Sequence, residues 1–160
     1  MKLKYITLFI ALGIISIGLS AYRTASANEH NHEHFVEGEK EGTKGIQFFK
    51  GTFKEALAEA KAQNKPVFID IYAVWCGPCK WMTANTFTNR EAAKFYNDNF
   101  INYKIDAERG EGPYVARKYG IRGYPTLLYL DGDGQVLHKV AGAHPAKSFV
   151  EVGESVIAKK

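Results

Sequence analysis

The stretch that decides the fold runs from residue 66 to residue 84 and reads PVFIDIYAVWCGPCKWMTA. Its first part is a short apolar run rich in β-branched and aromatic residues, which predicts a buried β-strand over 66–73. Pro78 suits the first turn of a helix, so a helix is expected to begin beside it. Cys76 and Cys79 lie at that junction and are the two cysteines of the 160-residue chain. A strand, a Cys-x-x-Cys motif and a helix, in this order, predict a redox-active cysteine pair.

The cysteine pair has two alternative interpretations, a structural zinc site and a structural disulfide. A structural zinc site needs four ligands, usually from two such pairs, and the sequence has no second pair. The five histidines do not form the paired spacing that zinc prefers. A structural disulfide would close too short a loop to restrict the unfolded chain much, so it would add little stability. Redox chemistry is therefore the favoured interpretation.

The expected chemistry follows from where the two sulfurs lie. At a helix N-terminus, unpaired N–H groups and the helix dipole favour a thiolate, which lowers the pKa of Cys76 and makes it the attacking sulfur. Cys79, one turn inside the helix, is expected to be buried and to resolve the mixed disulfide. Asp70 is the one charge in the apolar strand, so it is expected to face a dry interior with a raised pKa and to accept the Cys79 proton. The alternative is a solvated Asp70 at a strand edge.

The remainder of the chain from residue 46 predicts one domain of alternating strands and helices. Apolar periodicity and capping boxes predict helices over 52–63 and from Thr88 to about 97, and prolines predict helices from Pro113 and from Pro145. Strands are expected over 100–106, 126–131 and 136–141, with the last two joined by a hairpin turn at 131–134. The predicted class is α/β, with a mixed central sheet flanked by helices.

Three stretches resemble the thioredoxin family: residues 68–80, residues 118–130 (KYGIRGYPTLLYL) and residues 140–143. Together they span roughly residues 46 to 159, and the first two are highly specific. The resemblance implies a thioredoxin fold in which Cys76 is the nucleophile, Cys79 the resolving thiol and Asp70 the buried acid/base. It also implies a cis peptide bond before Pro125, which would face the active-site disulfide.

The same resemblance implies a substrate groove beside the cysteines. Trp75 follows the strand end and is expected to form a partly exposed wall of the groove rather than a core aromatic. Tyr124 would offer its backbone to an extended substrate, and its aromatic side chain could narrow the choice of substrate. The expected substrate-binding residues are Trp75, Gly77, Pro78, Tyr124 and Pro125.

Two departures from the common family pattern stand out. Many thioredoxins place a lysine near the buried aspartate, and alignment through Asp106 puts Asn102 at that position. We therefore expect weaker charge coupling to Asp70. The segment 87–91 (FTNRE) resembles the secreted thioredoxin-like branch, which includes the soluble end domain of membrane thiol:disulfide interchange proteins.

The first 27 residues predict a targeting segment. Lys2 and Lys4 give a positive start, an apolar run extends from Tyr5 to about Ala21, and 25–27 (ASA) supplies a small-x-small cleavage signal. The alternative is an uncleaved membrane anchor, because the run approaches the length that crosses a bilayer. Both interpretations predict an exported protein of the periplasm or cell envelope.

Residues 28–45 predict a flexible linker rich in His, Glu and Gly, which precedes a thioredoxin-like domain over 46–160. Cleavage after Ala27 would make His30 the third residue behind a free amine, an arrangement that suits Cu(II) or Ni(II). His30, His32 and His34 are therefore a side hypothesis for metal binding. A solvated histidine-rich spacer is the favoured interpretation, because short histidine tracts are only a compositional signal.

The charge of the chain does not point to nucleic acid. Loss of the targeting segment removes three of the 21 basic residues and no acidic ones, which leaves 18 against 17 and a net charge of +1 instead of +4. The sequence pI of about 9.0 therefore reflects the segment. The sequence has no flavin or nucleotide motif, so the expected redox group is the cysteine pair alone. We expect a monomer.

The sequence therefore predicts a thiol:disulfide oxidoreductase that acts on exported proteins. Gly77 and Pro78 between the cysteines resemble the strongly reducing family members, whereas oxidases and isomerases usually carry histidine there. A reductase is the main hypothesis, with electrons supplied by a membrane partner because soluble NADPH is absent outside the cytoplasm. The alternatives are a disulfide oxidase or isomerase, and a non-catalytic binding or metal-carrier module on the same scaffold.

Overall fold

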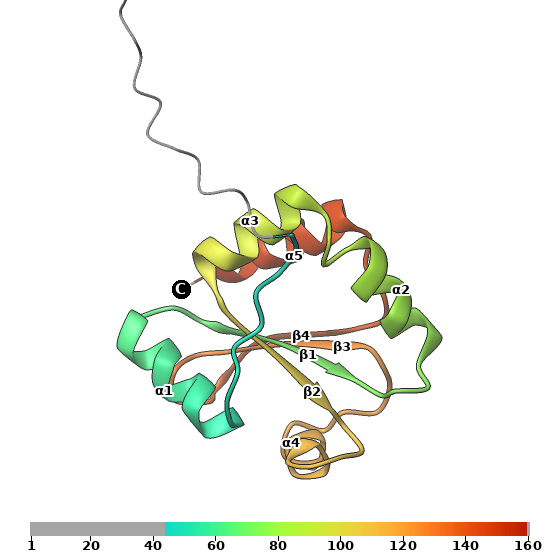
Figure 1. Cartoon of the computed structure of the whole chain (residues 1–160). Helices are drawn as coiled ribbons and strands as arrows, with labels where there is room; N and C mark the ends of the chain where they lie inside the picture. Colours follow the sequence, from blue (N-terminus) through green and yellow to red (C-terminus); the bar gives the residue numbers. More distant parts are fainter. Residues whose placement is uncertain (1–43, 160) are drawn as a thin grey trace, which may run out of the picture. The chain divides into compact units, whose positions relative to one another are not determined.

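The computed structural model describes residues 44–159 (Figure 1). The predicted targeting segment, most of the linker and the three linker histidines lie outside the described residues. Within 44–159, no helix is long and apolar enough to span a bilayer. The elements follow in the order α1 (Phe53–Gln63), β1 (Val67–Tyr72), α2 (Gly77–Asn85), α3 (Arg90–Asn99), β2 (Ile101–Asp106), α4 (Gly112–Lys118), β3 (Thr126–Leu130), β4 (Val136–Ala141) and α5 (Ala146–Ile157).

The four strands form one mixed sheet in the order β2-β1-β3-β4. β1 runs parallel to β2 and antiparallel to β3, and β3 and β4 form the predicted antiparallel hairpin. Strand β1 is therefore an interior strand with a neighbour on each side. Its carboxyl end leads straight into the cysteine pair, so the interior of the sheet positions the site.

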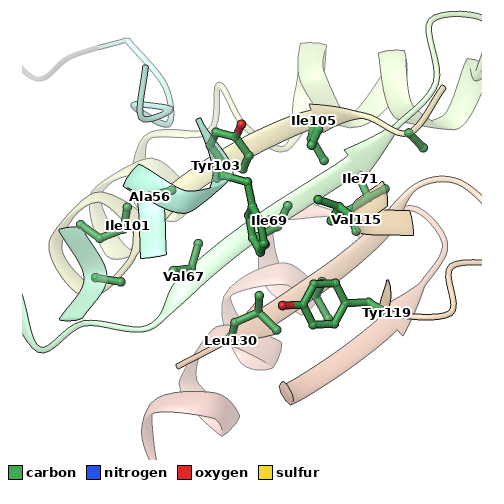
Figure 2. Close-up of a cluster of buried hydrophobic side chains, with 14 residues drawn as sticks. Ala56, Val67, Ile69, Ile71, Ile101, Tyr103, Ile105, Val115, Tyr119 and Leu130 are labelled. Atoms are coloured by element: carbon green, nitrogen blue, oxygen red, sulfur yellow. The ribbon is translucent and has the colours of Figure 1, made fainter. Parts of the chain in front are cut away.

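The two faces of the sheet bury different residues because side chains alternate along each strand. One face packs against α1 and α4, which lie on the same side of the sheet in Figure 1. This face carries the odd-numbered residues of β1 and β2. Its buried cluster includes Val67, Ile69, Ile71, Ile101, Tyr103 and Ile105 (Figure 2). The other face packs against α3 and α5 and includes Phe68, Leu127 and Tyr129. Asp70 shares the face of Phe68.

A pair of buried tyrosines joins the second face to its helices. The Tyr96 hydroxyl lies 2.7 Å from the Tyr129 hydroxyl and donates to the Phe149 carbonyl oxygen at 2.7 Å. The Tyr96 and Phe149 rings stack with centroids 3.9 Å apart. The polar groups of this apolar layer are thus paired with one another, which avoids the cost of an orphaned hydroxyl.

Local signals placed most helix ends correctly. Thr52 and Glu55 form the predicted capping box at α1, and Gly134 N–H donates to the Asp131 carbonyl in the predicted hairpin turn. The second predicted capping box, at Thr88, is wrong. Asn89 is the N-cap of α3, and its side chain accepts from the Ala92 N–H. The helix begins one residue later than the box requires, so Glu91 does not occupy the third position.

Candidate active site

The two cysteines form a disulfide at the start of α2. Their Cα atoms are 5.3 Å apart, and each residue is 3% exposed. Cys76 is the N-cap of α2, with extended backbone, and its sulfur accepts from the Cys79 N–H at 3.1 Å. Pro78 occupies the first turn, where its missing N–H leaves no helical hydrogen bond unmade. In the reduced protein this position favours a thiolate on Cys76, because the N–H groups and the helix dipole stabilise negative charge.

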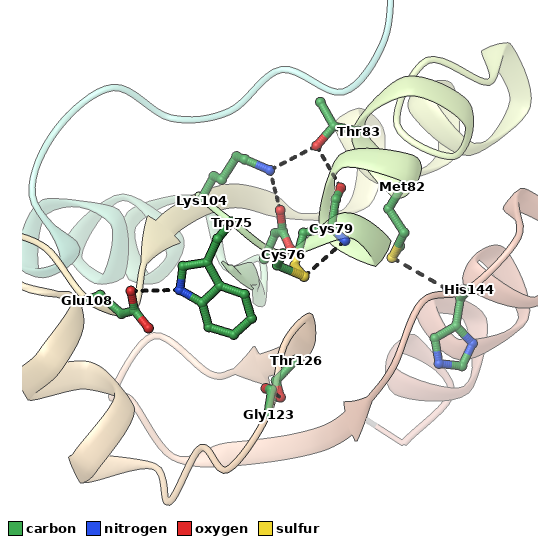
Figure 3. The surroundings of a disulfide bond; sticks show 11 residues. Trp75, Cys76, Cys79, Met82, Thr83, Lys104, Glu108, Gly123, Thr126 and His144 are labelled. Carbon is green, nitrogen blue, oxygen red and sulfur yellow. Dashed lines mark hydrogen bonds and ion pairs between the residues drawn. A yellow bond between two sulfur atoms is a disulfide. The ribbon is translucent and has the colours of Figure 1, made fainter. Parts of the chain in front are cut away.

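The position of α2 is fixed by its contacts with the segment before α5. The Thr86 hydroxyl donates to the His144 carbonyl oxygen at 2.6 Å. The His144 N–H donates to the Met82 sulfur at 3.5 Å (Figure 3). Met82 is fully buried in the α3–α5 layer. His144 therefore contributes its backbone to the placement of α2.

Asp70 lies on the interior strand β1 and is 1% exposed, so the solvated-edge alternative is wrong. Its Oδ2 forms an ion pair with the Lys104 ammonium of β2. Its Oδ1 is buried and has no hydrogen-bond partner among the described residues. Burial raises the pKa of Asp70, and the charge and hydrogen bond of Lys104 oppose that rise.

The expectation of weak charge coupling at Asp70 is wrong. Asn102 does occupy the aligned position, but Lys104 lies two residues further along β2 and is the register partner of Asp70. Residues two apart in a strand share a face, so Lys104 lies on the same side of the sheet as Asn102. Asn102 turns inward instead and donates to the Tyr96 carbonyl at 3.3 Å and the Asn97 Oδ1 at 3.2 Å.

Lys104 is held by more than its ion pair. Its Nζ donates to the Thr83 hydroxyl at 3.2 Å, and that hydroxyl donates to the Cys79 carbonyl oxygen at 3.1 Å (Figure 3). Three aromatic rings also face the ammonium, with centroid distances of 4.4 to 5.6 Å, which is within the range of a cation–π contact; they belong to Tyr72, Phe87 and Phe48. Sequence reasoning found neither Lys104 nor Thr83, although the two-residue periodicity of β2 could have indicated the lysine.

A pocket of about 340 Å³ opens beside this group. It lies between the end of β1 and the first turns of α2, and its lining includes Tyr72, Val74, Cys79, Lys80, Thr83 and Lys104. Val74 is exposed, whereas the side chain of Lys104 is 24% exposed. The pocket thus connects Cys79 and Lys104 to the surface.

The expected substrate-binding residues lie around the disulfide. Trp75 is 65% exposed, as a groove wall requires, and its indole N–H donates to a Glu108 carboxylate oxygen at 3.0 Å. The Tyr124 ring packs edge-on against the Trp75 ring, with centroids 5.9 Å apart, and contacts the small cluster that contains both cysteines. The Tyr124–Pro125 peptide bond is cis. A side chain at Gly77 would point into open space. Glu108 is a further site residue that sequence reasoning missed.

The described residues contain no group of three or more side chains suited to hold a metal ion. The redox-active group of this site is the disulfide, as in thioredoxin-family proteins, which need no further cofactor.

Comparison with known proteins gives a family. The sequence profile of the thioredoxin-like domain matches residues 53–157. The chain is 31% identical over 112 residues to chloroplastic thioredoxin Y of Oryza sativa subsp. japonica, an alignment that covers 70% of this chain. It covers 63% of that relative, so the chain spans less than two thirds of the relative's length.

Solved structures agree with this match. A Bacteroides thetaiotaomicron protein proposed to be a disulphide isomerase is 35% identical, with a TM-score of 0.65 over 73% of this chain and 97% of that one. The oxidised C-terminal domain of Neisseria meningitidis DsbD is 27% identical, with a TM-score of 0.56 over 69% of this chain and 97% of that one. Together with the cysteine pair, these similarities support thiol:disulfide oxidoreductase activity. The profile match over residues 53–157 shows that the chain belongs to the thioredoxin-like family.

Proposed function

We propose that this chain is an exported protein-disulfide reductase that works through the Cys76–Cys79 dithiol. The observation that carries the proposal is a cysteine pair at the N-terminus of α2 that is linked, through Thr83 and Lys104, to the buried carboxylate of Asp70. Cys76 is the nucleophile, Cys79 the resolving thiol and Asp70 the base. Trp75, Gly77, Pro78, Tyr124 and Pro125 form the surface that receives the substrate.

The reaction has two exchange steps. The Cys76 thiolate attacks one sulfur of a substrate disulfide, which forms a mixed disulfide and releases the other substrate sulfur as a thiolate. Cys79 then gives its proton to Asp70 and attacks the Cys76 sulfur. The Cys76–Cys79 bond forms, the bond from Cys76 to the substrate breaks, and the substrate sulfur leaves with the electron pair. The substrate disulfide is reduced by two electrons, and the protein dithiol is oxidised.

The reducing direction is supported by the residues between the cysteines. Gly77 and Pro78 place no titratable side chain beside the sulfurs, whereas a histidine there is usual in oxidases and isomerases. Reduction in an exported compartment needs a supply of electrons, and we propose a membrane thiol protein as the donor. The similarity to the DsbD C-terminal domain supports this choice. The predicted targeting segment supports export to the periplasm or cell envelope.

The reduction potential of the Cys76–Cys79 pair tests the direction. The full chain is equilibrated in glutathione buffers of known potential, and the oxidised fraction is read by thiol alkylation. A value below roughly −230 mV, close to the thioredoxin range, supports a reductase. A value above roughly −180 mV indicates an oxidase or isomerase and overturns the proposed direction. The 35% identical relative proposed to be a disulphide isomerase makes this the second candidate function.

Catalysis is separated from binding by insulin reduction with dithiothreitol. The wild-type chain is expected to turn over, and Cys76→Ser is expected to abolish turnover because the attacking sulfur is lost. Cys79→Ser should accumulate stable mixed disulfides with partner proteins, because the resolving step is removed. Turnover that survives Cys76→Ser would contradict the proposed mechanism, and a wild-type chain without turnover would favour a binding module.

A further inference from the structure

We propose that Thr83 is a positioning residue for the resolving step: its hydroxyl, anchored on the Cys79 carbonyl oxygen, holds the Lys104 ammonium on the Asp70 carboxylate. This inference rests on the proposed function, because it concerns the second exchange step of that reaction. It assigns a role to a residue of α2 that lies outside the Cys-x-x-Cys motif and on the pocket side of the disulfide.

The direction of the hydrogen bonds supports the role. The Thr83 hydroxyl has one hydrogen, and it donates that hydrogen to the Cys79 carbonyl oxygen at 3.1 Å. The same oxygen therefore presents its lone pairs to the Lys104 Nζ, 3.2 Å away, which donates to it. An ammonium has three donors, so Lys104 can serve Thr83 and Asp70 together and still point a third hydrogen at the pocket. One hydroxyl thus ties α2 to the ion pair between β1 and β2.

The hydrogen bond to Thr83 matters because other residues pack against the Lys104 ammonium on only one side. The aromatic rings of Phe48, Tyr72 and Phe87 confine the ammonium near the protein. The pocket of about 340 Å³ leaves it space on the side of α2. A four-carbon side chain has several rotamers available in such a space, and ordering it costs conformational entropy. The Thr83 hydroxyl is the α2 side-chain group that hydrogen bonds Lys104 in the described chain.

The ion pair matters because Asp70 must be ionised to accept the Cys79 proton. Burial raises the pKa of Asp70 and so favours its neutral form, whereas the positive charge of Lys104 lowers that pKa. The Oδ1 atom of Asp70 is unpaired among the described residues and is free to take a proton while Oδ2 stays with Lys104. If Lys104 moves into the pocket, Asp70 stays protonated to higher pH and the resolving step slows at neutral pH.

Other charged and titratable groups lie around the ion pair. Tyr72 of β1 lies under the Lys104 ammonium, and Lys80 of α2 lines the same pocket. Asp106 lies two residues along β2 from Lys104. Burial and the charge of Asp106 raise the pKa of Tyr72, whereas Arg109, which pairs with Asp106, lowers it. Thr83→Val changes none of these charges. A change in the pH dependence of that variant therefore reports the position of Lys104.

The test is a stopped-flow reaction of the reduced full-length chain with the disulfide reagent 5,5′-dithiobis(2-nitrobenzoate). The attack of Cys76 releases a first coloured thiolate, and resolution by Cys79 releases a second. Thr83→Val is expected to leave the first release unchanged and to slow the second about two- to fivefold near pH 7, with its acid limb moved up by about 0.3 to 0.7 pH units. Thr83→Ser, which restores the hydroxyl, is expected to behave like the wild type.

Thr88→Val is the matched control. Thr88 is exposed like Thr83, and its hydroxyl makes the same kind of bond, to the Ala84 carbonyl four residues earlier at 2.7 Å. A general effect of losing a hydroxyl that donates to the carbonyl four residues earlier would appear in both variants, whereas the proposed effect appears only at Thr83. Titration of the Asp70 carboxyl carbon by NMR should show the same upward move of its pKa in Thr83→Val and in Thr83→Ala.

Two results overturn parts of this account separately. An unchanged second release and an unchanged Asp70 titration in Thr83→Val would show that water replaces the hydroxyl and that Thr83 positions nothing. A wild-type chain that gives no second release would instead overturn the proposed dithiol mechanism itself.

Discussion

Asp70 and Lys104 are register partners on the parallel strands β1 and β2, and their side chains form an ion pair between a buried carboxylate and a half-buried ammonium. The Lys104 ammonium links Asp70 to α2, because it also donates to the Thr83 hydroxyl, which donates to the Cys79 carbonyl oxygen. Two opposed effects therefore set the charge of Asp70: desolvation raises its pKa, and Lys104 lowers it. The first two predictions separate these effects.

Lys104→Met is expected to raise the pKa of Asp70 further, because the cation that favours its ionised form is lost while the burial remains. The acid limb of insulin-reduction turnover should move to higher pH, by about one pH unit, and the rate at neutral pH should fall up to about tenfold. Lys80→Met is the control, since Lys80 lines the same pocket but forms no ion pair with Asp70. Equal pH profiles for the wild type and Lys104→Met would contradict the coupling.

Asp70→Asn is expected to stabilise the oxidised protein at neutral pH. The folded-state pKa of Asp70 lies above its unfolded value of about 3.9, so the folded state binds the proton more tightly and stability falls as pH rises from that value through the folded pKa. The asparagine side chain does not ionise, so the variant does not lose stability in this way as the pH rises. Each unit by which the folded-state pKa of Asp70 exceeds its unfolded-state pKa corresponds to about 1.4 kcal/mol of stability.

Denaturant unfolding at pH 4 and pH 7 measures this effect. The advantage of Asp70→Asn over the wild type should be larger at the higher pH. Asp98→Asn is the control, because Asp98 pairs with Lys94 on the exposed surface of α3, where an ion pair contributes little. If the stability difference between Asp70→Asn and the wild type is the same at pH 4 and pH 7, the pKa of Asp70 in the folded protein is not raised.

The buried tyrosine pair predicts an asymmetry between two similar substitutions. Tyr96→Phe should cost about 1 to 3 kcal/mol, because it removes the acceptor of the Tyr129 hydroxyl and the donor to the Phe149 carbonyl. Tyr129→Phe leaves the Tyr96–Phe149 bond in place, so it should cost less. Thermal or urea unfolding compares the two variants directly. Equal losses would mean that the Phe149 bond contributes nothing.

Tyr124→Ala is expected to weaken the use of protein substrates without slowing the chemistry of the cysteines. The substitution removes the ring that packs against Trp75 on the proposed substrate surface, so the KM for insulin should rise about three- to tenfold. The rate with a small disulfide reagent should stay close to the wild-type rate, because such a reagent does not need the wall. Tyr114→Ala, at an exposed tyrosine of α4, serves as the control. An unchanged KM would remove Tyr124 from the substrate surface.

Several features follow from neighbouring residues alone. The apolar run before Cys76 specifies a buried strand, and a charge inside that run has to be buried with it, which is why Asp70 could be predicted. Thr52 and Glu55 contact each other within a single helical turn, so their capping box can be predicted from the sequence. The turn at residues 131–134 is local for the same reason.

The features that only the tertiary structure decided join residues far apart in the chain. Lys104 meets Asp70 across 34 positions because of the β1–β2 register, and Glu108 meets Trp75 across 33. Alignment placed the partner of Asp70 at Asn102, but the amide of Asn102 pairs with α3 and the long side chain of Lys104 serves the carboxylate instead. Thr83 meets Lys104 only because α2 packs beside that lysine. Sequence spacing specifies contacts within a turn, whereas contacts between strands and helices depend on register, side-chain length and packing, which are properties of the whole fold.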